Sequence, residues 1–276
     1  MMAAITSRDN PKVKQVRSLR QRKQREASGM FLVEGIHHVG EAVQSAATGT
    51  NGTNIEHIFY APDLLTSEFA IQLIRDQIQA GTPCFSASED IFRSLTEKEN
   101  PQGILAVVRQ KEARLGELNP ANFPWGVALM TPQDPGNIGT ILRTIDGVGA
   151  AGLILIDNSA DPYHPSAVRA SMGAIFWRPV ARTSFEEFKE WTEQYRSNIY
   201  GTSARGSRDY RTEASYHLPL VLLMGSEREG LSAEALKICS ELVRLPMQGR
   251  VSSLNLAVAA GVMMYEIHAQ VKNLGG

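Results

Sequence analysis

The sequence predicts an α/β protein built mainly on a parallel sheet with helices on both faces. Two observations lead to this prediction. Short, almost continuously apolar runs recur through the C-terminal half, and segments with helical periodicity separate them. Strands that are apolar throughout are buried on both faces, and parallel strands are usually joined by a helix. A smaller α/β part is expected before this sheet, because strand and helix patterns also alternate over residues 1–113.

Length and composition limit the class of protein. The chain has 276 residues, of which 43% are hydrophobic, so it can bury one large core or two smaller ones. Its 28 Lys and Arg residues nearly balance its 29 Asp and Glu residues, so the net charge indicates no class of partner. The two cysteines lie far apart and the histidines lack metal-ligand spacing, so we expect neither a disulfide framework nor a metal site.

The sequence also predicts a cytoplasmic protein without membrane contact. The start, MMAAITSRDNPK, contains no apolar stretch typical of a signal peptide. No apolar run is long enough to span a membrane, and the longest, over residues 254–265, contains Asn255 and suits a buried helix.

The first part is expected to begin with a helix. Asn10 and Pro11 form a favourable N-cap and first-turn pair, and the helix should run to about residue 27. The segment 113–126 contains two prolines, two glycines and two asparagines, which predicts a linker. We therefore expect a first domain over 1–113, a linker over 114–125 and a second domain over 126–276. The further elements expected in the first domain are strand 31–35, helix 36–47, strand 54–61, helix 67–79 and strand 103–110.

The second domain alternates strands and helices in the order that a parallel sheet requires. Its expected elements are strand 127–131, helix 138–149, strand 153–157, helix 184–195, strands 198–203 and 220–225, a helix from residue 232, strand 242–246, and a final helix over 253–271.

The N-terminal helix is strongly cationic. The only acid between residues 8 and 25 is Asp9, and this local field favours polyanions. A solvated helix face, with Val13, Val16 and Leu19 packed in the core, is the alternative, because charge runs are unspecific. We favour nucleic-acid binding by the eight cations, which are Arg8, Lys12, Lys14, Arg17, Arg20, Arg22, Lys23 and Arg25.

Three strand-to-loop junctions have unusual chemistry. They occupy residues 131–144 (TPQDPGNIGTILRT), 222–232 (LLMGSEREGLS) and 244–261 (RLPMQGRVSSLNLAVAAG). Each places glycines after a buried strand, and ligands of open α/β sheets bind beyond the carboxyl ends of strands. Because the P-loop and GxGxxG patterns are absent, a standard nucleotide site is not indicated. The three loops together predict one shared site.

These junctions resemble the three motifs of the SpoU (TrmH-like) RNA 2′-O-ribose methyltransferases, within the SPOUT superfamily. The resemblance covers residues 125–271 in order, spacing and strand–loop–helix context. Residues 10–43 and 99–108 are similar to the opening and close of the family's ribosomal-protein-like RNA-binding domain. The motif residues are Asn137, Gly139 and Arg143 in the first segment, Gly225-Ser226-Glu227 and Gly230-Leu231 in the second, and Leu245-Pro246-Met247 and Ser253-Leu254-Asn255 in the third.

The resemblance implies transfer of a methyl group from S-adenosylmethionine to a ribose 2′-hydroxyl of RNA, by a homodimer with a C-terminal trefoil knot. It favours ribosomal RNA; a tRNA substrate and a non-catalytic ribosome-assembly factor are the alternatives. Arg169, in segment 161–180, matches the region where relatives contact RNA; a packing loop with a capped short helix is the alternative for this segment. The implied catalytic set is Arg143, Asn137, Glu227, Ser253 and Asn255. The implied cofactor-binding set is Gly225, Leu245, Met247 and Leu254, with Thr202 or Ser203.

The chemistry of the reaction gives these residues expected roles. A ribose hydroxyl needs its developing negative charge stabilised, and the Arg143 guanidinium suits this role; a salt bridge on its own helix is the alternative. We expect Asn137 to cap the helix that starts at residue 138, and Ser252 or Ser253 to cap the last helix. Asn255 would then lie one turn inside that helix. Glu227 is expected to bind either loop backbone or Arg143.

Overall fold

The computed structural model describes residues 4–204, 206–211 and 215–274. The contacts of the chain divide it into two compact units. Unit 1 comprises residues 1–111 and 163–177, and unit 2 comprises residues 112–162 and 178–276. The ends of the expected domains, residues 1–3 and 275–276, lie outside the described part.

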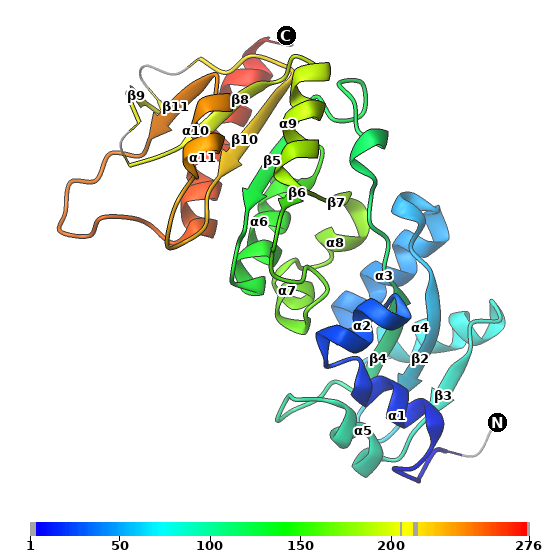
Figure 1. Ribbon diagram of the computed structural model, residues 1–276. Helices are drawn as coiled ribbons and strands as arrows, with labels where there is room; N and C mark the ends of the chain where they lie inside the picture. Colours follow the sequence, from blue (N-terminus) through cyan, green and yellow to red (C-terminus); the bar gives the residue numbers. More distant parts are fainter. Residues whose placement is uncertain (1–3, 205, 212–214, 275–276) are drawn as a thin grey trace. The chain divides into compact units, whose positions relative to one another are not determined.

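Unit 1 is a mixed α/β structure (Figure 1). Its described sheet has the strand order β1-β4-β2-β3, in which β4 is antiparallel to both neighbours and β3 is parallel to β2. Its elements are α1 (Pro11–Ser18), α2 (Arg22–Ser28), β1 (Met30–Glu34), α3 (Ile36–Thr48), a 3-10 turn (Thr50–Gly52), β2 (Ile55–Tyr60), α4 (Glu68–Gln79), β3 (Cys84–Ser86), α5 (Glu89–Leu95), β4 (Ile104–Arg109), α7 (Pro165–Ala170) and α8 (Ala174–Trp177).

One face of this sheet is covered by α1 and α5. Val13, Val16 and Leu19 are buried against Leu105 and Phe92, so the apolar face of α1 lies in the core. Burying a Val or Leu side chain contributes about 1.5–3 kcal/mol, which anchors the helix. The cations of α1 therefore occupy its remaining faces. The expected core packing is confirmed, and nucleic-acid binding by these cations stays a prediction.

The helix expected over residues 10–27 is two helices, and this expectation was wrong in its continuity. α1 ends at Ser18 and α2 begins at Arg22. The buried Arg25 guanidinium donates hydrogen bonds of 2.9 Å and 2.7 Å to the carbonyl oxygens of Leu19 and Arg20. These carbonyls lie at the end of α1, where a helix leaves acceptors unsatisfied, so Arg25 stabilises the break.

Unit 2 contains a seven-stranded sheet within the described residues (Figure 1). All its strand pairs are parallel, which confirms the mainly parallel α/β class. Its elements are a 3-10 turn (Leu115–Glu117), β5 (Trp125–Met130), α6 (Pro135–Val148), β6 (Leu153–Ile156), β7 (Val180–Thr183), α9 (Phe185–Gln194), β8 (Asn198–Thr202), β9 (Arg208–Asp209), β10 (Leu220–Met224), α10 (Ala233–Ile238), β11 (Glu241–Arg244) and α11 (Leu256–Leu274).

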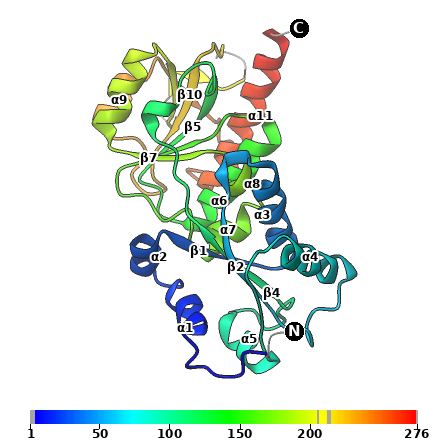
Figure 2. The same cartoon turned by 90° about the vertical axis from the view of Figure 1, so that its right-hand side faces the viewer.

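Helices cover both faces of this sheet. α9 lies on one side of β5 and β10, and α6 lies with α11 on the other (Figure 2). Phe188 and Trp191 of α9 pack with Met130 and Leu223 in one core layer. Alternate side chains such as Leu129 and Leu222 are also fully buried and point to the opposite face, toward the α6–α11 layer. The unbroken apolar strands of the sequence are thus explained by burial on both faces.

The strand order is β7-β6-β5-β10-β8-β11-β9. The chain first builds β5, β6 and β7, and it then crosses over to β8 and β9. β10 pairs with both β5 and β8, and β11 pairs with both β8 and β9. Two late strands therefore enter the sheet between strands that precede them in sequence.

Two segments differ in placement from the sequence-based outline. Residues 163–177, which follow β6, pack with unit 1: the ring centroid of Tyr163 lies 4.7 Å from that of Phe31. The expected linker, 114–125, packs on unit 2, where Leu118 and Phe123 are buried in the core. The short elements β3, α5, α8, β7 and β9 were not anticipated from the sequence.

Candidate active site

The three glycine-rich loops lie at one edge of the unit 2 sheet. They follow β5, β10 and β11, and the loop after β8 accompanies them. Because β5, β10, β8 and β11 are neighbouring parallel strands, their carboxyl ends meet at the same edge. Ligands of open α/β sheets bind at such an edge, so this is the candidate active site.

The turn after β5 is sharp because two backbone features combine. Thr131 has a φ of +48°, in a left-handed region that β-branched residues rarely adopt. Asp134 then caps α6 by accepting a 2.8 Å hydrogen bond from the backbone N–H of Gly136, and Pro135 occupies the first turn. The expected cap, Asn137, was wrong: α6 begins three residues earlier, and Asn137 lies inside the helix with a buried side chain.

Three predicted catalytic residues form one hydrogen-bonded chain, which we name the amide clasp: Asn137, Glu227 and Asn255. The Asn255 Nδ2 donates to Asn137 Oδ1 at 3.0 Å. The Asn137 Nδ2 donates to Glu227 Oε1, also at 3.0 Å. The other Glu227 oxygen, Oε2, accepts from the backbone N–H of Gln133 at 3.2 Å. One side-chain relay thus joins the loops after β5, β10 and β11.

The direction of the amide clasp is set by its two ends. Asn255 Oδ1 accepts from the backbone N–H groups of Ala257 and Val258 at 2.9 Å and 3.3 Å. A backbone N–H can only donate, so the Asn255 amide nitrogen must face Asn137. The Asn137 oxygen then faces Asn255 and its nitrogen faces Glu227, which accepts through both oxygens as a carboxylate.

The same contacts correct the start of the last helix. α11 begins at Leu256, and Asn255 is its cap. The expected cap at Ser252 or Ser253 was therefore wrong, as was the placement of Asn255 one turn inside the helix. Ser253 lies two residues before the cap and is exposed.

Glu227 is the charged member of the amide clasp. Burial opposes its ionisation, but hydrogen bonds from Asn137 and from the backbone N–H groups of Gln133, Asp134 and Glu227 itself outweigh burial. These hydrogen bonds hold the pKa of Glu227 below its ordinary value. Of the two expected roles for Glu227, the structure favours binding to loop backbone.

Arg143 lies apart from the amide clasp. It is exposed on α6, six residues after Asn137. Among the residues that the structure describes, none forms a hydrogen bond or ion pair with its side chain. The alternative of a salt bridge on its own helix therefore lacks support. Helical side chains leave the backbone tilted toward the N-terminus of their helix, which for Arg143 is the end of α6 that carries the clasp.

Gly225 allows the loop after β10 to fold back on itself. A Cβ atom at this position would lie 1.9 Å from the carbonyl carbon of Gly230 and 2.3 Å from the nitrogen of Leu231. Both are backbone atoms, so no side-chain movement could relieve the contact. The Gly230 N–H donates a 3.1 Å hydrogen bond to Ser226 O, which closes the turn.

The other predicted cofactor-binding residues lie at the same edge of the sheet. Thr202 ends β8, and the N–H of the next residue, Ser203, donates to Val243 O at 3.0 Å. Leu245 and Met247 are half-buried in the loop after β11, and Leu254 is 39% exposed. The tightly folded backbone at Gly225 lies in the same site as accessible apolar side chains. This combination fits a ligand with a flat ring and polar edges, as adenine has.

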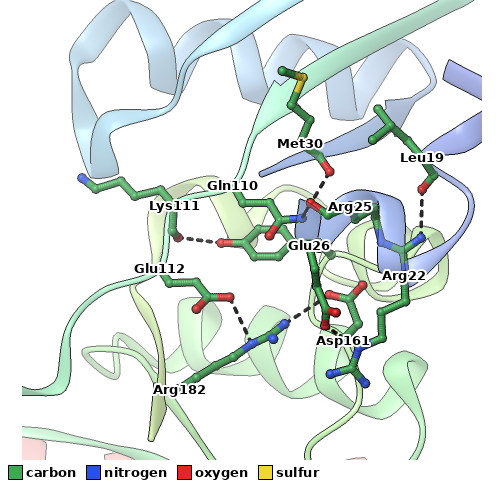
Figure 3. Close-up of polar contacts among 11 residues, drawn as sticks. Leu19, Arg22, Arg25, Glu26, Met30, Gln110, Lys111, Glu112, Asp161 and Arg182 are labelled. Atoms are coloured by element: carbon green, nitrogen blue, oxygen red, sulfur yellow. Dashed lines mark hydrogen bonds and ion pairs between the residues drawn. The ribbon is translucent and has the colours of Figure 1, made fainter. Parts of the chain in front are cut away.

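The predicted RNA-contacting cations belong to unit 1. Arg8, Lys14, Arg22 and Lys23 are exposed; Lys12, Arg17 and Arg20 are partly buried. Arg25 is the exception, because it is 1% exposed and Figure 3 shows it turned toward the carbonyl of Leu19. Its charge is not available to RNA in this structure, so it leaves the proposed set. Arg169 is exposed at the end of α7.

One member of the site, Gln133, was missed by sequence reasoning. Gln133 binds Glu227 through its backbone, and its side chain donates a 2.7 Å hydrogen bond to Thr131 O. Gln133 is not among the motif residues of the family, so the motifs gave no signal for either contact.

In the described ranges, no group of three His, Cys, Asp or Glu side chains is placed to hold a metal ion, and no helix is long and apolar enough to cross a membrane.

Two protein families match the segments that contain these motifs and the N-terminal domain. Residues 124–265 match the SpoU rRNA Methylase family, and residues 10–106 match the MRM3-like substrate binding domain. Both matches confirm the resemblance drawn from the three motifs and from the N-terminal segments.

Relatives with curated descriptions align over nearly the whole chain. The 23S rRNA (guanosine(2553)-2'-O)-methyltransferase RlmP of Bacillus subtilis is 30% identical over 96% of this chain and 99% of its own length. The 23S rRNA (uridine(2479)-2'-O)-methyltransferase of Streptomyces viridochromogenes is 34% identical over 95% of this chain and 90% of its own length.

Solved structures agree with the fold. An AdoMet-bound rRNA methyltransferase from Sinorhizobium meliloti has a TM-score of 0.85 at 35% identity, with 97% of each chain covered. The SpoU methyltransferase AviRb from Streptomyces viridochromogenes, in complex with AdoMet, has a TM-score of 0.84 at 31% identity, covering 95% of this chain and 98% of AviRb. From its motifs, its fold and these matches, the chain belongs to the SpoU rRNA methylase family.

Proposed function

We propose that this protein transfers a methyl group from S-adenosylmethionine to a ribose 2′-hydroxyl of ribosomal RNA. The amide clasp carries the proposal, because it joins the three family motifs into one site at the carboxyl edge of the sheet. Two relatives that align over almost the whole chain are named for 23S rRNA 2′-O-methylation, which favours ribosomal RNA over tRNA.

The cofactor is proposed to bind between the loops after β8, β10 and β11. Gly225 brings the backbone of the β10 loop close to its own return, and Leu245, Met247 and Leu254 supply apolar surface. Thr202 and Ser203 add polar groups at the end of β8. When bound, S-adenosylmethionine supplies a methyl group already activated by its sulfonium.

Arg143 is proposed as the catalytic residue that stabilises the developing alkoxide. A guanidinium keeps its proton in proteins, so it serves as a cationic fork for the ribose oxygen and a neighbouring phosphate, not as a base. Its lack of a partner among the described residues leaves its donors available to RNA. Ser253, exposed beside the clasp, is proposed to contact the substrate.

Asn137, Glu227 and Asn255 are proposed to act by holding the loops of the site in position. Their polar atoms are largely committed to one another and to backbone, so they hold the three loops in register. A shift of about 1 Å in a reacting group can cost two orders of magnitude in rate, so this rigidity supports in-line transfer.

The test is a methyl-transfer assay with labelled S-adenosylmethionine and unmodified 23S ribosomal RNA. Transfer should appear in a ribose 2′-O-methyl group and fall at least a hundredfold in Arg143→Ala, on the scale of losing a transition-state donor. Calorimetry should show that this variant still binds the cofactor, and Thr140→Ala, on the same helix, serves as the matched control. Cofactor binding without transfer to 23S RNA, tRNA or assembled subunits would support the non-catalytic alternative instead.

The division of labour between domains is also proposed. Residues 1–113 would bind RNA through the remaining cations of the N-terminal helices, together with Arg169 of the 163–177 segment. Residues 114–125 would connect the domains, and residues 126–276 would catalyse. RNA affinity should then fall with salt, with a log–log slope of roughly −0.7 for each phosphate contacted on single strands. A slope near zero would contradict an electrostatic interface.

A homodimer is proposed from an exposed apolar stripe on unit 2. Leu254 precedes α11, and Val258, Val262 and Tyr265 follow at helical spacing; they are 39%, 53%, 38% and 60% exposed. The opposite side of α11 is buried against α6, which leaves this stripe uncovered by the described residues of unit 2. Exposed apolar patches of this kind mark interfaces, and a second copy presents the same stripe in return.

The trefoil knot and the location complete the proposal. The insertion of β10 and β11 between earlier strands supports a knot, because the chain must pass beside segments already in place. Pulling both ends of the unfolded chain should leave a contour length shorter than that of an unknotted chain of equal length. Ribosomal RNA as substrate would place the protein in the cytoplasm.

A further inference from the structure

Unit 1 contains a cavity of about 100 Å³ that the proposed active site does not use. The end of α1, the strands β1 and β4, helix α3, the turn after α5 and the α7 segment all contribute to its wall. All these residues belong to unit 1, including those of the 163–177 segment. α7 packs against β1 (Figure 2). Arg169 of α7 and Arg20 line the same cavity.

Three cations face the cavity, and two of them are only loosely paired. The Arg20 Nε lies 3.9 Å from Glu97, and the Lys98 Nζ lies 3.8 Å from Glu34. The third cation, Arg169, is exposed at the rim. Glu34 and Glu97 are the two carboxylates among the lining residues, so the three cations leave the cavity wall with a net positive charge. The Glu97 side chain is 73% exposed, so it can swing into solvent when an anion enters.

Arg20 has an unmet hydrogen-bonding requirement. Its Nη2 is buried and has no hydrogen-bond partner among the described residues. A buried donor of a charged group without a partner is costly, and a movement of the Arg20 side chain toward an anionic oxygen in the cavity would remove that cost. Arg17, one turn earlier on α1, is by contrast held by Ser94 at 2.7 Å.

The remaining wall is apolar. Leu32, Leu95, Leu105 and Val168 line the cavity and are buried. An anion alone would not need this surface, whereas a nucleotide offers a flat base or ribose together with its phosphate. The cavity volume distinguishes a free small molecule from one unit of a polymer. Sites for complete small molecules span roughly 300–1,000 Å³, so this smaller cavity suits one fragment of a longer polymer chain.

We propose that this cavity holds one unstacked nucleotide of the RNA substrate. Its phosphate is bound by Arg20, Lys98 and Arg169, and its base or ribose lies on the leucine surface. The proposal rests on the proposed function, because it takes RNA as the substrate. RNA is favoured over a free nucleotide because Arg20, in the cavity wall, directly follows α1, a helix that carries further cations for neighbouring phosphates.

The first test measures RNA affinity with single-charge variants. Arg169→Ala and Lys98→Ala should each raise the Kd for transcripts tiling unmodified 23S ribosomal RNA about tenfold, as loss of one charge-assisted contact predicts. The log–log salt slope should also become shallower by roughly 0.7 in each. Arg75→Ala, which removes an exposed arginine of α4 outside the cavity, should leave the Kd and the slope unchanged.

The second test locates the nucleotide. Photocrosslinking of 4-thiouridine-containing transcripts to the full chain should label peptides that contain Leu95–Lys98 or Val168–Arg169. Crosslinks confined to other segments, together with unchanged affinity in both variants, would overturn the proposal. Binding of free nucleoside monophosphates in the cavity, without RNA crosslinks there, would overturn it in favour of a small-molecule site.

The two proposals fail separately. If Arg143→Ala abolishes methyl transfer while Arg169→Ala and Lys98→Ala leave RNA binding and KM unchanged, the methyltransferase function stands and the cavity has another role. If the native chain transfers no methyl group but the cavity variants weaken RNA binding and the crosslinks map to the cavity, the nucleotide site stands without the reaction. When both hold, the cavity variants raise KM for RNA and leave kcat near its native value.

Discussion

Glu227 is the one member of the amide clasp whose charge depends on pH. Its two oxygens accept from Asn137 and from backbone N–H groups, and these bonds hold its pKa below the ordinary 4.5. A carboxyl group with a lowered folded pKa contributes stability above its unfolded pKa, and that contribution is lost as pH falls through the folded pKa.

We therefore predict that Glu227→Gln lowers the melting temperature at about pH 7 and that the difference from the native protein shrinks toward about pH 3. Differential scanning calorimetry across this range measures the effect. Glu229→Gln, in the same loop but outside the clasp, should give a small, pH-independent difference. A pH-independent penalty in Glu227→Gln would mean that the carboxylate charge does not contribute.

Asn137 bridges the other two clasp residues, so its removal leaves two side chains without this hydrogen-bond partner. Asn137→Ala should destabilise the protein by about 1–3 kcal/mol, because the Asn255 amide and the Glu227 carboxylate lose their common neighbour. Urea denaturation measures the change. Thr140→Ala, on the exposed side of α6, should stay within about 0.5 kcal/mol. Equal effects of the two substitutions would show that the clasp contributes little.

At the scale of elements, the loop after β10 depends on the absence of a side chain at one position. A Cβ on Gly225 meets backbone atoms of Gly230 and Leu231, so the loop must open to accept it. By contrast, a Cβ on Gly249 would have no atom within 4 Å, and its φ is ordinary. The two glycines therefore provide a matched pair in neighbouring loops.

Gly225→Ala should cost about 1–3 kcal/mol through overpacking and should weaken S-adenosylmethionine binding at least tenfold, because the displaced loop belongs to the proposed cofactor site. Gly249→Ala should change neither quantity. Isothermal calorimetry and urea denaturation measure both. Native cofactor affinity in Gly225→Ala would remove this loop from the cofactor site.

The break between α1 and α2 shows how one buried side chain changes an element. Periodicity and charge predict one continuous helix over 10–27, and the local pattern contains no glycine or proline that would interrupt it. The Arg25 guanidinium binds the carbonyls of Leu19 and Arg20 and so stabilises two helices instead of one. The residue that seemed to extend the cationic surface is instead part of the core of unit 1.

At the scale of the whole molecule, the proposed dimer depends on the exposed stripe of α11. Val258→Glu places a charge within that stripe and should convert a dimer to a monomer, as measured by light scattering coupled to size exclusion. Ile78→Glu, at a residue 52% exposed on α4, is the matched control and should remain dimeric. A native protein that is monomeric at micromolar concentration, or a dimeric Val258→Glu, would contradict this interface.

Local sequence patterns were sufficient for much of this protein. Apolar strands alternating with helices predicted the parallel α/β class, and glycine-rich turns after buried strands located the three site loops. Both signals lie within short segments, because burial on two faces and tight turns are local requirements on residue type. The order and spacing of the motifs also identified the family.

Only the tertiary structure could decide how the site is connected. Asn137 meets Glu227 across 90 positions of the sequence and Asn255 across 118, and nothing in either local segment specifies the distant partner. Asn255 caps α11, whereas Asn137 does not cap α6, because Asp134 and Pro135 already begin that helix. The 163–177 segment likewise packs with unit 1 through contacts of Tyr163 and Phe176 with Phe31, far apart in sequence. Such partners are chosen by the strand order of the sheet and by packing, which are properties of the folded chain.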